Sequence, residues 1–223
     1  WKGRIGMKVG LALGGGAIRG LAHIGVLKVF KKHQIPVDFI AGTSMGAAIG
    51  GLVAAGIDIE EIEELILDTP SYRFVDIGIR KRGIFAGNKI YAMLIQFLEQ
   101  KGLGDIRIED LKIPFRTVSV DLMKGNVFVF EEGSLVLAIR ATTSVPGIFS
   151  PVHYQGKVLV DGGVLNNLPA DLPRAAGMNV VLAVDVEREH EEQEPGNLFE
   201  VVYRSFTIMT TVQRRANLKY ADV

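Results

Sequence analysis

The sequence predicts an α/β fold in which helices flank a largely parallel central sheet. Short uncharged stretches that suit strands alternate along the chain with amphipathic stretches that suit helices, the order typical of this class. The first strand, expected over residues 8–13, is an apolar run that ends in glycines, as in a parallel strand buried on both faces. Glycine supplies 26 of the 223 residues, about 12% against a usual value of about 7%, and it gathers where strands turn into helices.

The remaining elements follow from hydrophobic spacing. Helices are expected over residues 21–32, 45–55, 59–67, 89–101 and 198–215, and further strands over 36–41, 115–120, 126–130, 158–160 and 180–184. Asn88 suits the N-cap of the fourth helix and Gly102 its C-terminal end. The last helix is long and amphipathic, with apolar residues at 198, 201, 202, 206, 209 and 212. Residues 220–223 suit the start of one more strand, which suggests a truncated chain.

Length and composition favour one ordinary globular domain, expected over residues 8–223, with residues 1–7 as a leader or a remnant of cloning. Lys+Arg and Asp+Glu both number 25, and this balance argues against a nucleic-acid binder, which must neutralise phosphates. The chain has no cysteine, so disulfides, thiolate catalysis and cysteine metal sites are excluded. Residues 1–7 contain no long apolar region typical of a signal peptide, and a cytoplasmic protein is expected.

One stretch of 19 residues, 39–57, carries no charge and approaches the length of a membrane span. Five of its residues are glycine, and its centre is rich in alanine rather than leucine. We therefore expect a strand, a turn and a buried helix with a face of small residues.

The turn inside this stretch, Gly42-Thr43-Ser44-Met45-Gly46, has the Gly-x-Ser-x-Gly pattern of a nucleophile elbow. It follows a strand and opens a helix, which is the context that such an elbow requires. Gly42 and Gly46 would permit the tight turn, and the helix N-terminus behind Ser44 favours negative charge nearby. The alternative is an ordinary strand-to-helix turn with Thr43 or Ser44 as the N-cap.

A second glycine cluster, Gly14-Gly15-Gly16-Ala17-Ile18-Arg19-Gly20, joins the first strand to the first helix. Its backbone N–H groups could form an anion site. One interpretation is an oxyanion hole. The other is a dinucleotide-binding loop with Asp38 as the ribose acid, although the Gly-x-Gly-x-x-Gly spacing is absent and Asp38 precedes its strand.

A third motif, Asp161-Gly162-Gly163, follows the strand at 158–160. It could be a hairpin turn, or Asp161 could be the base that takes the Ser44 proton, with Gly162 and Gly163 leaving room for close approach. A serine triad would need a histidine downstream of the acid, and only His190 qualifies, within a charged run. A Ser44–Asp161 dyad is therefore the better hypothesis. It requires that burial raise the pKa of Asp161.

These three motifs, in this order, resemble the patatin-like phospholipase family, especially its compact bacterial members. Residues 21–27 look like the first helix of that family, residues 141–149 like the segment before the acid, and Asn166-Asn167-Leu168-Pro169 like the turn after it. The resemblance covers residues 8–186 and implies a three-layer α/β/α fold. Ala17 stands where the family usually has a third consecutive glycine, and alanine resists a positive φ.

The resemblance implies a serine lipid acyl hydrolase, of phospholipase, lysophospholipase or carboxylesterase type, with Ser44 as nucleophile and Asp161 as base. It assigns the oxyanion loop to Gly15, Gly16, Ala17, Arg19 and Gly20, supported by Gly14. It implies no metal and no cofactor, and a phospholipid, lysophospholipid or other fatty-acyl ester as substrate, reached through transient contact with a membrane surface. The alternatives are a Ser-His-Asp esterase using His190, a nucleotide-binding protein without hydrolysis, and an inactive lipid-binding member of the family.

Two further segments bear on the substrate. Residues 79–85 mix cations with apolar side chains and could touch an anionic bilayer, or could be a solvated basic loop. Met93, Leu94, Phe97 and Leu98 could line an acyl groove, or could be core residues of the helix at 89–101.

Overall fold

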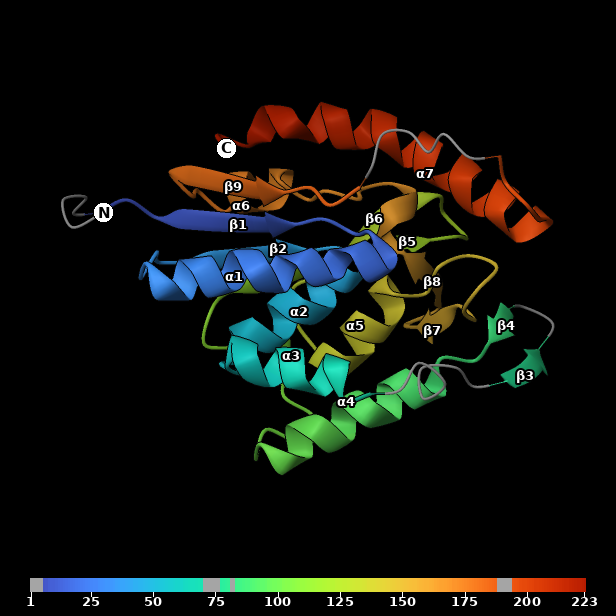
Figure 1. The fold of residues 1–223 in the computed structure, drawn as a ribbon, viewed down its shortest axis with the longest axis horizontal. Coiled ribbons are helices and arrows are strands. Elements are labelled where there is room, and N and C mark those ends of the chain that lie inside the picture. Colours follow the sequence, from blue (N-terminus) through green and yellow to red (C-terminus); the bar gives the residue numbers. More distant parts are fainter. Residues whose placement is uncertain (1–5, 70–76, 81–82, 188–193) are drawn as a thin grey trace.

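The computed structural model describes residues 6–69, 77–80, 83–187 and 194–223 (Figure 1). Its described strands form a seven-stranded sheet in which hydrogen-bonded neighbours follow the order β7-β8-β5-β2-β1-β9. β8 and β2 pair with successive parts of one edge of β5, and β6 pairs with the opposite edge of β5. The strands are β1 (Val9–Leu13), β2 (Phe39–Gly42), β5 (Phe115–Asp121), β6 (Asn126–Phe130), β7 (Val152–Tyr154), β8 (Lys157–Asp161) and β9 (Val180–Val184). The β5-β2-β1-β9 portion is parallel, whereas β6, β7 and β8 pair antiparallel. A separate pair joins β3 (Ile77–Arg80) and β4 (Gly83–Phe85).

Helices cover both faces of this sheet, which confirms the predicted fold class. One layer contains α1 (Ala22–Lys32), α2 (Met45–Ala54), α3 (Ile59–Leu67), α4 (Asn88–Gln100) and α5 (Leu135–Thr142). α6 (Asp171–Ala175) packs on the opposite face, and β9 and β1 lie between α7 (Leu198–Asn217) and α1 (Figure 1).

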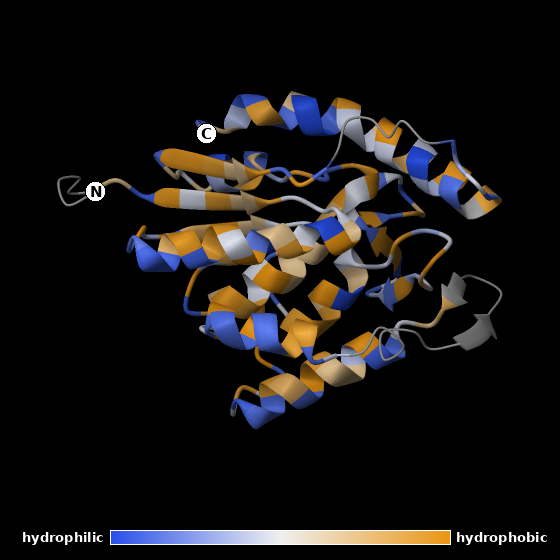
Figure 2. Cartoon of the chain, in the orientation of Figure 1, coloured by the Kyte–Doolittle hydropathy of each residue, from blue (hydrophilic) through white to orange (hydrophobic). Residues whose placement is uncertain are grey.

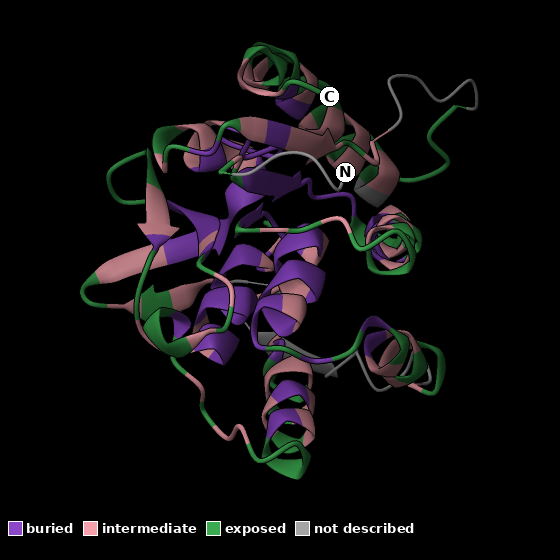
Figure 3. Cartoon of the chain, turned by 90° about the vertical axis from the view of Figure 1, so that its left-hand side faces the viewer, coloured by how far each residue is buried: buried purple, intermediate pink, exposed green. Residues whose placement is uncertain are grey.

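The alternation of side chains along the strands builds two separate cores. In β1, Leu11 and Leu13 join the large cluster under α1–α5, whereas Ala12 joins the smaller cluster under α6. The central strands β1, β2 and β5 are consequently buried, whereas β6, β7 and the outer helices are partly or fully exposed (Figure 3). Figure 2 shows the same division as apolar strands within a more polar shell.

The predicted elements are present, with ends that differ by a few residues. Gly102 ends α4 with a φ of +72°, and its amide donates to the Glu99 carbonyl. Asn88, however, is the first residue of α4, and the N-cap is Gly87, whose φ of 74° makes the turn. The sequence patterns did not predict α5, α6, β7 or the β3–β4 pair.

The uncharged stretch 39–57 forms β2, a turn and α2, as predicted. No helix among the described residues is both long and apolar enough to cross a bilayer. The backbone of residues 222–223 bonds to Val181 and Ala183 beside β9.

The turn between β2 and α2 depends on one close backbone approach. A Cβ added at Gly46 would lie 2.3 Å from the Leu13 carbonyl oxygen and 2.6 Å from that of Gly14. Both neighbours are main chain, so neither can move aside without shifting β1. In contrast, a Cβ added at Gly25, in the exposed middle of α1, would meet no atom within 4 Å.

We therefore expect opposite effects from the same substitution at these two glycines. Gly46→Ala should lower the free energy of unfolding by about 1–3 kcal/mol because it overpacks a rigid crossing. Gly25→Ala should raise it by about 0.5–1 kcal/mol because alanine favours helix. Urea denaturation of both variants tests this pair, and a neutral Gly46→Ala would contradict the close crossing.

Candidate active site

Ser44 occupies a strained turn between β2 and α2. Its backbone has φ 53° and ψ −124°, a conformation that costs a non-glycine residue about 1–3 kcal/mol. Its amide donates to Thr142 Oγ1 at 3.0 Å, and this hydroxyl donates to the Val118 carbonyl at 2.5 Å. Thr43 Oγ1 donates to the Asn166 carbonyl at 2.8 Å. These bonds hold the turn on both sides and present the Ser44 side chain to the cavity.

The pairing along β5 explains how Asp161 reaches this turn. Residues 115–117 of β5 pair in parallel with β2, and residues 119–121 of the same edge pair antiparallel with β8. β8 therefore continues where β2 stops, and the two strands run toward each other. Gly42 lies opposite Thr117, and Asp161 lies opposite Ser119. The carboxyl ends of β2 and β8 thus meet about two residues apart along β5.

Asp161 has the environment of a buried base. Its side chain is 2% exposed, and the Gly163 amide donates to Oδ1 at 2.7 Å. The other oxygen, Oδ2, is buried and has no hydrogen-bond partner among the described residues. Burial raises the pKa of Asp161 to about 7, while hydrogen bonding from Gly163 and from the Ser44 side chain opposes this rise. Asp161-Gly162-Gly163 is not a hairpin, because Asp161 caps the 3₁₀ turn Gly162–Val164.

The first part of the glycine loop is fixed by its own amides. Gly14 donates to the Val184 carbonyl at 3.0 Å, and Gly15 donates to that of Asn167 at 2.9 Å. A Cβ added at Gly15 would lie 2.3 Å from Asn167 Oδ1 and 3.3 Å from Ser44 Cβ, so this glycine permits a close approach to the serine. The Gly15 amide is therefore occupied, which corrects its assignment as an oxyanion donor.

In the second part of the loop, two backbone amides remain available to donate a hydrogen bond to a bound group. Neither Gly16 nor Ala17 donates a backbone hydrogen bond to another described residue, and both line the cavity that holds Ser44. The Arg19 amide, in contrast, donates to the Gly16 carbonyl at 2.9 Å, which removes Arg19 as a donor. Gly20 is a packing residue, since a Cβ there would lie 2.5 Å from Met45 Cγ. Gly16 and Ala17 are therefore the loop residues whose backbone amides remain available to a bound group.

Ala17 adopts the conformation that alanine resists. Its φ is 47°, in the left-handed region that glycine occupies without cost. Alanine at position 17 is therefore strained. The 3₁₀ turn Ala17–Leu21 follows directly and leads into α1.

Three side chains support the glycine loop, and the sequence patterns did not predict this role for His23. His23 is fully buried, and its Nε2–H donates to the Gly14 carbonyl at 2.8 Å. Burial lowers the pKa of His23, so the ring stays neutral. Asn167 Nδ2 donates to the Gly15 carbonyl at 3.3 Å. The Arg19 guanidinium pairs with Glu187 at 2.6 Å, which ties the loop to the segment after β9.

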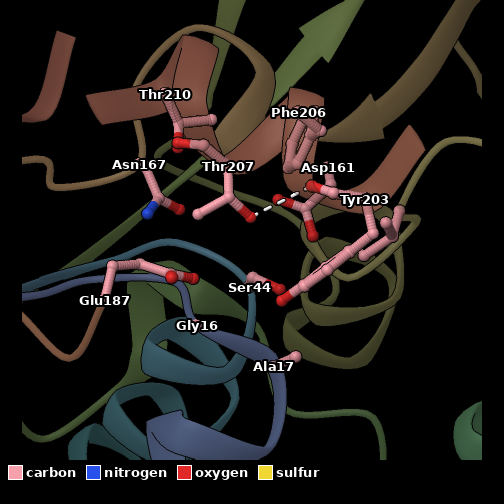
Figure 4. Close-up of a pocket in the computed structure, with 11 residues that line it drawn as sticks. Gly16, Ala17, Ser44, Asp161, Asn167, Glu187, Tyr203, Phe206, Thr207 and Thr210 are labelled. Atoms are coloured by element: carbon pink, nitrogen blue, oxygen red, sulfur yellow. Dashed lines mark hydrogen bonds between the residues drawn. The ribbon is translucent and has the colours of Figure 1, made fainter. Parts of the chain in front are cut away.

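α7 forms one wall of the cavity. The lining residues come from the glycine loop, the elbow, the segments before and after Asp161, the segment after β9, and α7; they are Gly16, Ala17, Ser44, Val145, Asp161, Asn167, Glu187, Tyr203, Phe206, Thr207 and Thr210 (Figure 4). Figure 4 shows Tyr203 extending across the cavity toward Ser44, and Thr207 Oγ1 donating to the Tyr203 carbonyl at 3.1 Å. The remaining volume is about 20 Å³, room for about one water molecule.

Other candidates from the sequence lie apart from this cavity. His190, Lys81 and Arg82 fall outside the described residues. Asp38 accepts the Val9 amide at 2.7 Å at the start of β1, the far end of that strand from the glycine loop, which contradicts the dinucleotide interpretation. Leu94 and Leu98 are buried in the core beneath α4 and do not line the cavity. Across the described ranges, no three histidine or acidic side chains are grouped to hold a metal ion.

Comparison with known proteins gives one consistent result. The family model for patatin-like phospholipase matches residues 11–174. An NTE family protein of Mycobacterium tuberculosis is 35% identical over 196 residues, covering 87% of this chain and 52% of that protein. Patatin-like phospholipase domain-containing protein 6 of Homo sapiens is 34% identical over 194 residues, covering 83% of this chain and 14% of that protein.

Two more matches extend this result. Lysophospholipase NTE1 of Eremothecium gossypii is 35% identical over 198 residues, covering 81% of this chain and 12% of that protein. The chain thus spans about half the length of the mycobacterial relative and a smaller part of the others. The crystal structure of VipD from Legionella pneumophila shares the fold, with a TM-score of 0.55 and 15% identity over 73% of this chain and 47% of that one.

Relief of strain at position 17 should be measurable. We expect Ala17→Gly to raise the free energy of unfolding by about 1 kcal/mol, because the left-handed conformation costs alanine about 1–2 kcal/mol. Gln34, an exposed residue with a φ of 52°, gives a matched control for the general effect of glycine. Urea denaturation should show a similar gain for Gln34→Gly, and a loss in Ala17→Gly alone would show that the Ala17 methyl group contributes packing.

The raised pKa of Asp161 should also make stability depend on pH. Between the unfolded pKa of 3.8 and the folded pKa of about 7, the folded protein keeps a proton that the unfolded chain releases. Stability from this group is therefore fully present below the lower value and declines as the pH rises, by at most about 4 kcal/mol. Asp161→Asn should remove this decline and be more stable than wild type at pH about 8. Urea denaturation at acidic and alkaline pH tests this, and parallel pH profiles in the two proteins would contradict it.

Proposed function

The chain belongs to the patatin-like phospholipase family, and on that premise we propose that it is a serine lipid acyl hydrolase in which Ser44 and Asp161 form the catalytic dyad. The observation that carries the proposal is the placement of a strained serine and a buried, half-satisfied carboxylate in one cavity with two available amides. The proposed substrates are phospholipids, lysophospholipids or other fatty-acyl esters. The name of the fungal relative, a lysophospholipase, supports the same class.

In the first half of the reaction, Ser44 Oγ attacks the ester carbonyl carbon and its proton passes to Asp161 Oδ2. The negative charge that develops on the carbonyl oxygen is stabilised by the amides of Gly16 and Ala17. When the tetrahedral intermediate collapses, the C–O bond to the alcohol breaks and the alcohol takes the proton from Asp161. An acyl-serine remains.

In the second half, a water molecule attacks the acyl-serine and transfers a proton to Asp161. The collapse of the second intermediate releases the fatty acid and returns the proton to Ser44 Oγ. A pKa of about 7 suits both duties of Asp161, since a group that accepts and returns a proton works best near the ambient pH. The hydroxyl of Ser44 and the carboxyl of Asp161 suffice for this proton traffic without an imidazole.

Substitution of the dyad should abolish turnover. Ser44→Ala and Asp161→Asn should each lower kcat/KM for p-nitrophenyl butyrate by about 10³-fold or more, because one removes the nucleophile and the other the base. Ser150→Ala is the matched control, because this serine hydroxyl is buried without a partner among the described residues and does not line the cavity. His190→Ala should retain activity. Full activity in Asp161→Asn, or loss in His190→Ala, would replace the dyad with a histidine mechanism.

The proposed mechanism also predicts how kcat/KM depends on pH in the same assay. Because the ionised form of Asp161 is the base, kcat/KM should rise with pH through an apparent pKa near 7 and then level off. A fluorophosphonate probe should label the wild type with the same pH dependence and should not label Ser44→Ala. Labelling that is independent of pH would contradict Asp161 as the base.

A further inference from the structure

Three consecutive peptide groups of the glycine loop are each held at the carbonyl oxygen. The pairs of acceptor and donor residues are Gly14 with His23, Gly15 with Asn167, and Gly16 with Arg19. The first two donors are side chains, and the third is the main-chain amide of the 3₁₀ turn that follows. A planar trans peptide group points its C=O and its N–H in opposite directions, so a bond that fixes the carbonyl also fixes the direction of the N–H.

Two of these peptide groups carry the amides that remain available to a bound group. The Ala17 N–H shares a peptide group with the Gly16 carbonyl, which is held by a main-chain amide. The Gly16 N–H shares a peptide group with the Gly15 carbonyl, which accepts from Asn167 Nδ2 at 3.3 Å. Among the described residues, Asn167 is therefore the side chain that sets the direction of one of the two available amides.

Asn167 is itself fixed between the glycine loop and the turn that holds Asp161. Its main-chain carbonyl accepts the Gly15 amide at 2.9 Å, so main chain and side chain hold the same residue of the loop. A Cβ added at Gly15 would lie 2.3 Å from Asn167 Oδ1, and one added at Gly163 would lie 2.9 Å from the same atom. The side chain thus fills the space that these two glycines leave, and Figure 4 shows it pointing toward the loop at Gly16.

From this geometry we propose that Asn167 is a positioning residue for the oxyanion hole: its side-chain amide holds the Gly15 carbonyl and thereby aims the Gly16 N–H at the developing oxyanion. The inference rests on the function proposed above, because an oxyanion forms only if an ester is attacked. The proton transfers belong to Ser44 and Asp161 and do not involve Asn167. A hydrogen bond accepted by a peptide carbonyl also polarises the peptide group, which strengthens its N–H as a donor.

Kinetics of Asn167→Ala test this role. The substitution keeps the main-chain carbonyl that accepts the Gly15 amide and removes the bond to the Gly15 carbonyl. We expect kcat and kcat/KM for p-nitrophenyl butyrate to fall by the same factor, at least about tenfold, because an interaction made in the transition state is lost. The apparent pKa of the pH profile should stay at about 7, since the Gly163 amide still donates to Asp161.

A transition-state analogue tests the same point without turnover. The boron of butylboronic acid forms a tetrahedral adduct with a serine hydroxyl, and one of its oxygens takes the place of the oxyanion. Its affinity for Asn167→Ala should fall by the same factor as kcat/KM. Asn167→Asp keeps the shape of the side chain but loses the Nδ2 donor, so it should lower kcat/KM and boronate affinity at least as much.

Asn166→Ala is the matched control. Asn166 precedes Asn167, is 6% exposed as Asn167 is, and makes side-chain hydrogen bonds with Asp171 and Asn217 instead of the loop. It does not line the cavity, and its main-chain carbonyl, which accepts the Thr43 hydroxyl, is kept in the variant. Asn166→Ala should keep kcat, KM and boronate affinity within about twofold. Equal losses in Asn166→Ala and Asn167→Ala would overturn the proposal.

NMR relaxation follows the Gly16 amide directly. We expect the order parameter of the Gly16 N–H to be about 0.85 in the wild type and in Asn166→Ala, and below about 0.6 in Asn167→Ala. Full kcat in Asn167→Ala, or a fall in kcat without this loss of order, would overturn the proposal. If the wild type hydrolyses no ester but the order parameter falls as expected, Asn167 fixes the Gly16 amide and the proposed chemistry is wrong.

Discussion

The backbone of Ser44 is the constraint on which the site depends. Its positive φ persists because β1, α5 and the segment after Asp161 each fix one side of the turn. Thr142 accepts the Ser44 amide, Asn166 accepts the Thr43 hydroxyl, and Gly46 passes against the carbonyls at the end of β1. Ser44, Asp161 and the glycine loop, to which the proposal assigns the nucleophile, the base and the oxyanion hole, are therefore held together by the backbone crossing at the ends of β1, β2 and β8.

The site concentrates interactions that disfavour folding. Ser44 and Ala17 both have positive φ, and Asp161 is buried with one oxygen unpaired. Glu187 adds a second carboxyl whose pKa is raised by burial, an effect that the adjacent Arg19 guanidinium opposes. Such clusters of strain and desolvated charge occur where the surrounding structure is rigid enough to maintain them. Here that rigidity comes from the parallel strands and from the two cores on either face of the sheet.

Sequence patterns predicted most strands and most helices because each of these follows from local spacing. The motifs also predicted which segments would meet, since Gly42, Asp161 and the glycine loop all lie at strand ends. What the sequence did not reveal is the division of β5 between β2 and β8, which is a tertiary pairing that no local pattern encodes. α5 was missed because it is buried on nearly all sides and so lacks an amphipathic stripe.

The sequence also did not reveal which backbone amides of the glycine loop are available as hydrogen-bond donors. Five loop residues were expected to form the oxyanion hole, but the amides of Gly15 and Arg19 are occupied by carbonyls whose positions depend on the whole fold. Likewise, spacing identified α7 as amphipathic but gave no information about which face it buries. The face that α7 buries lines a cavity that five other segments of the chain complete, so the choice of face depends on tertiary contacts.

Four hydroxyl side chains of α7 form hydrogen bonds within the helix itself. Ser205, Thr207, Thr210 and Thr211 each donate to a carbonyl three or four residues earlier in the same helix. Their acceptors belong to the same helix, so these bonds do not depend on the segments packed against α7. Thr207 and Thr210 can therefore line the cavity without leaving a hydroxyl group unpaired there.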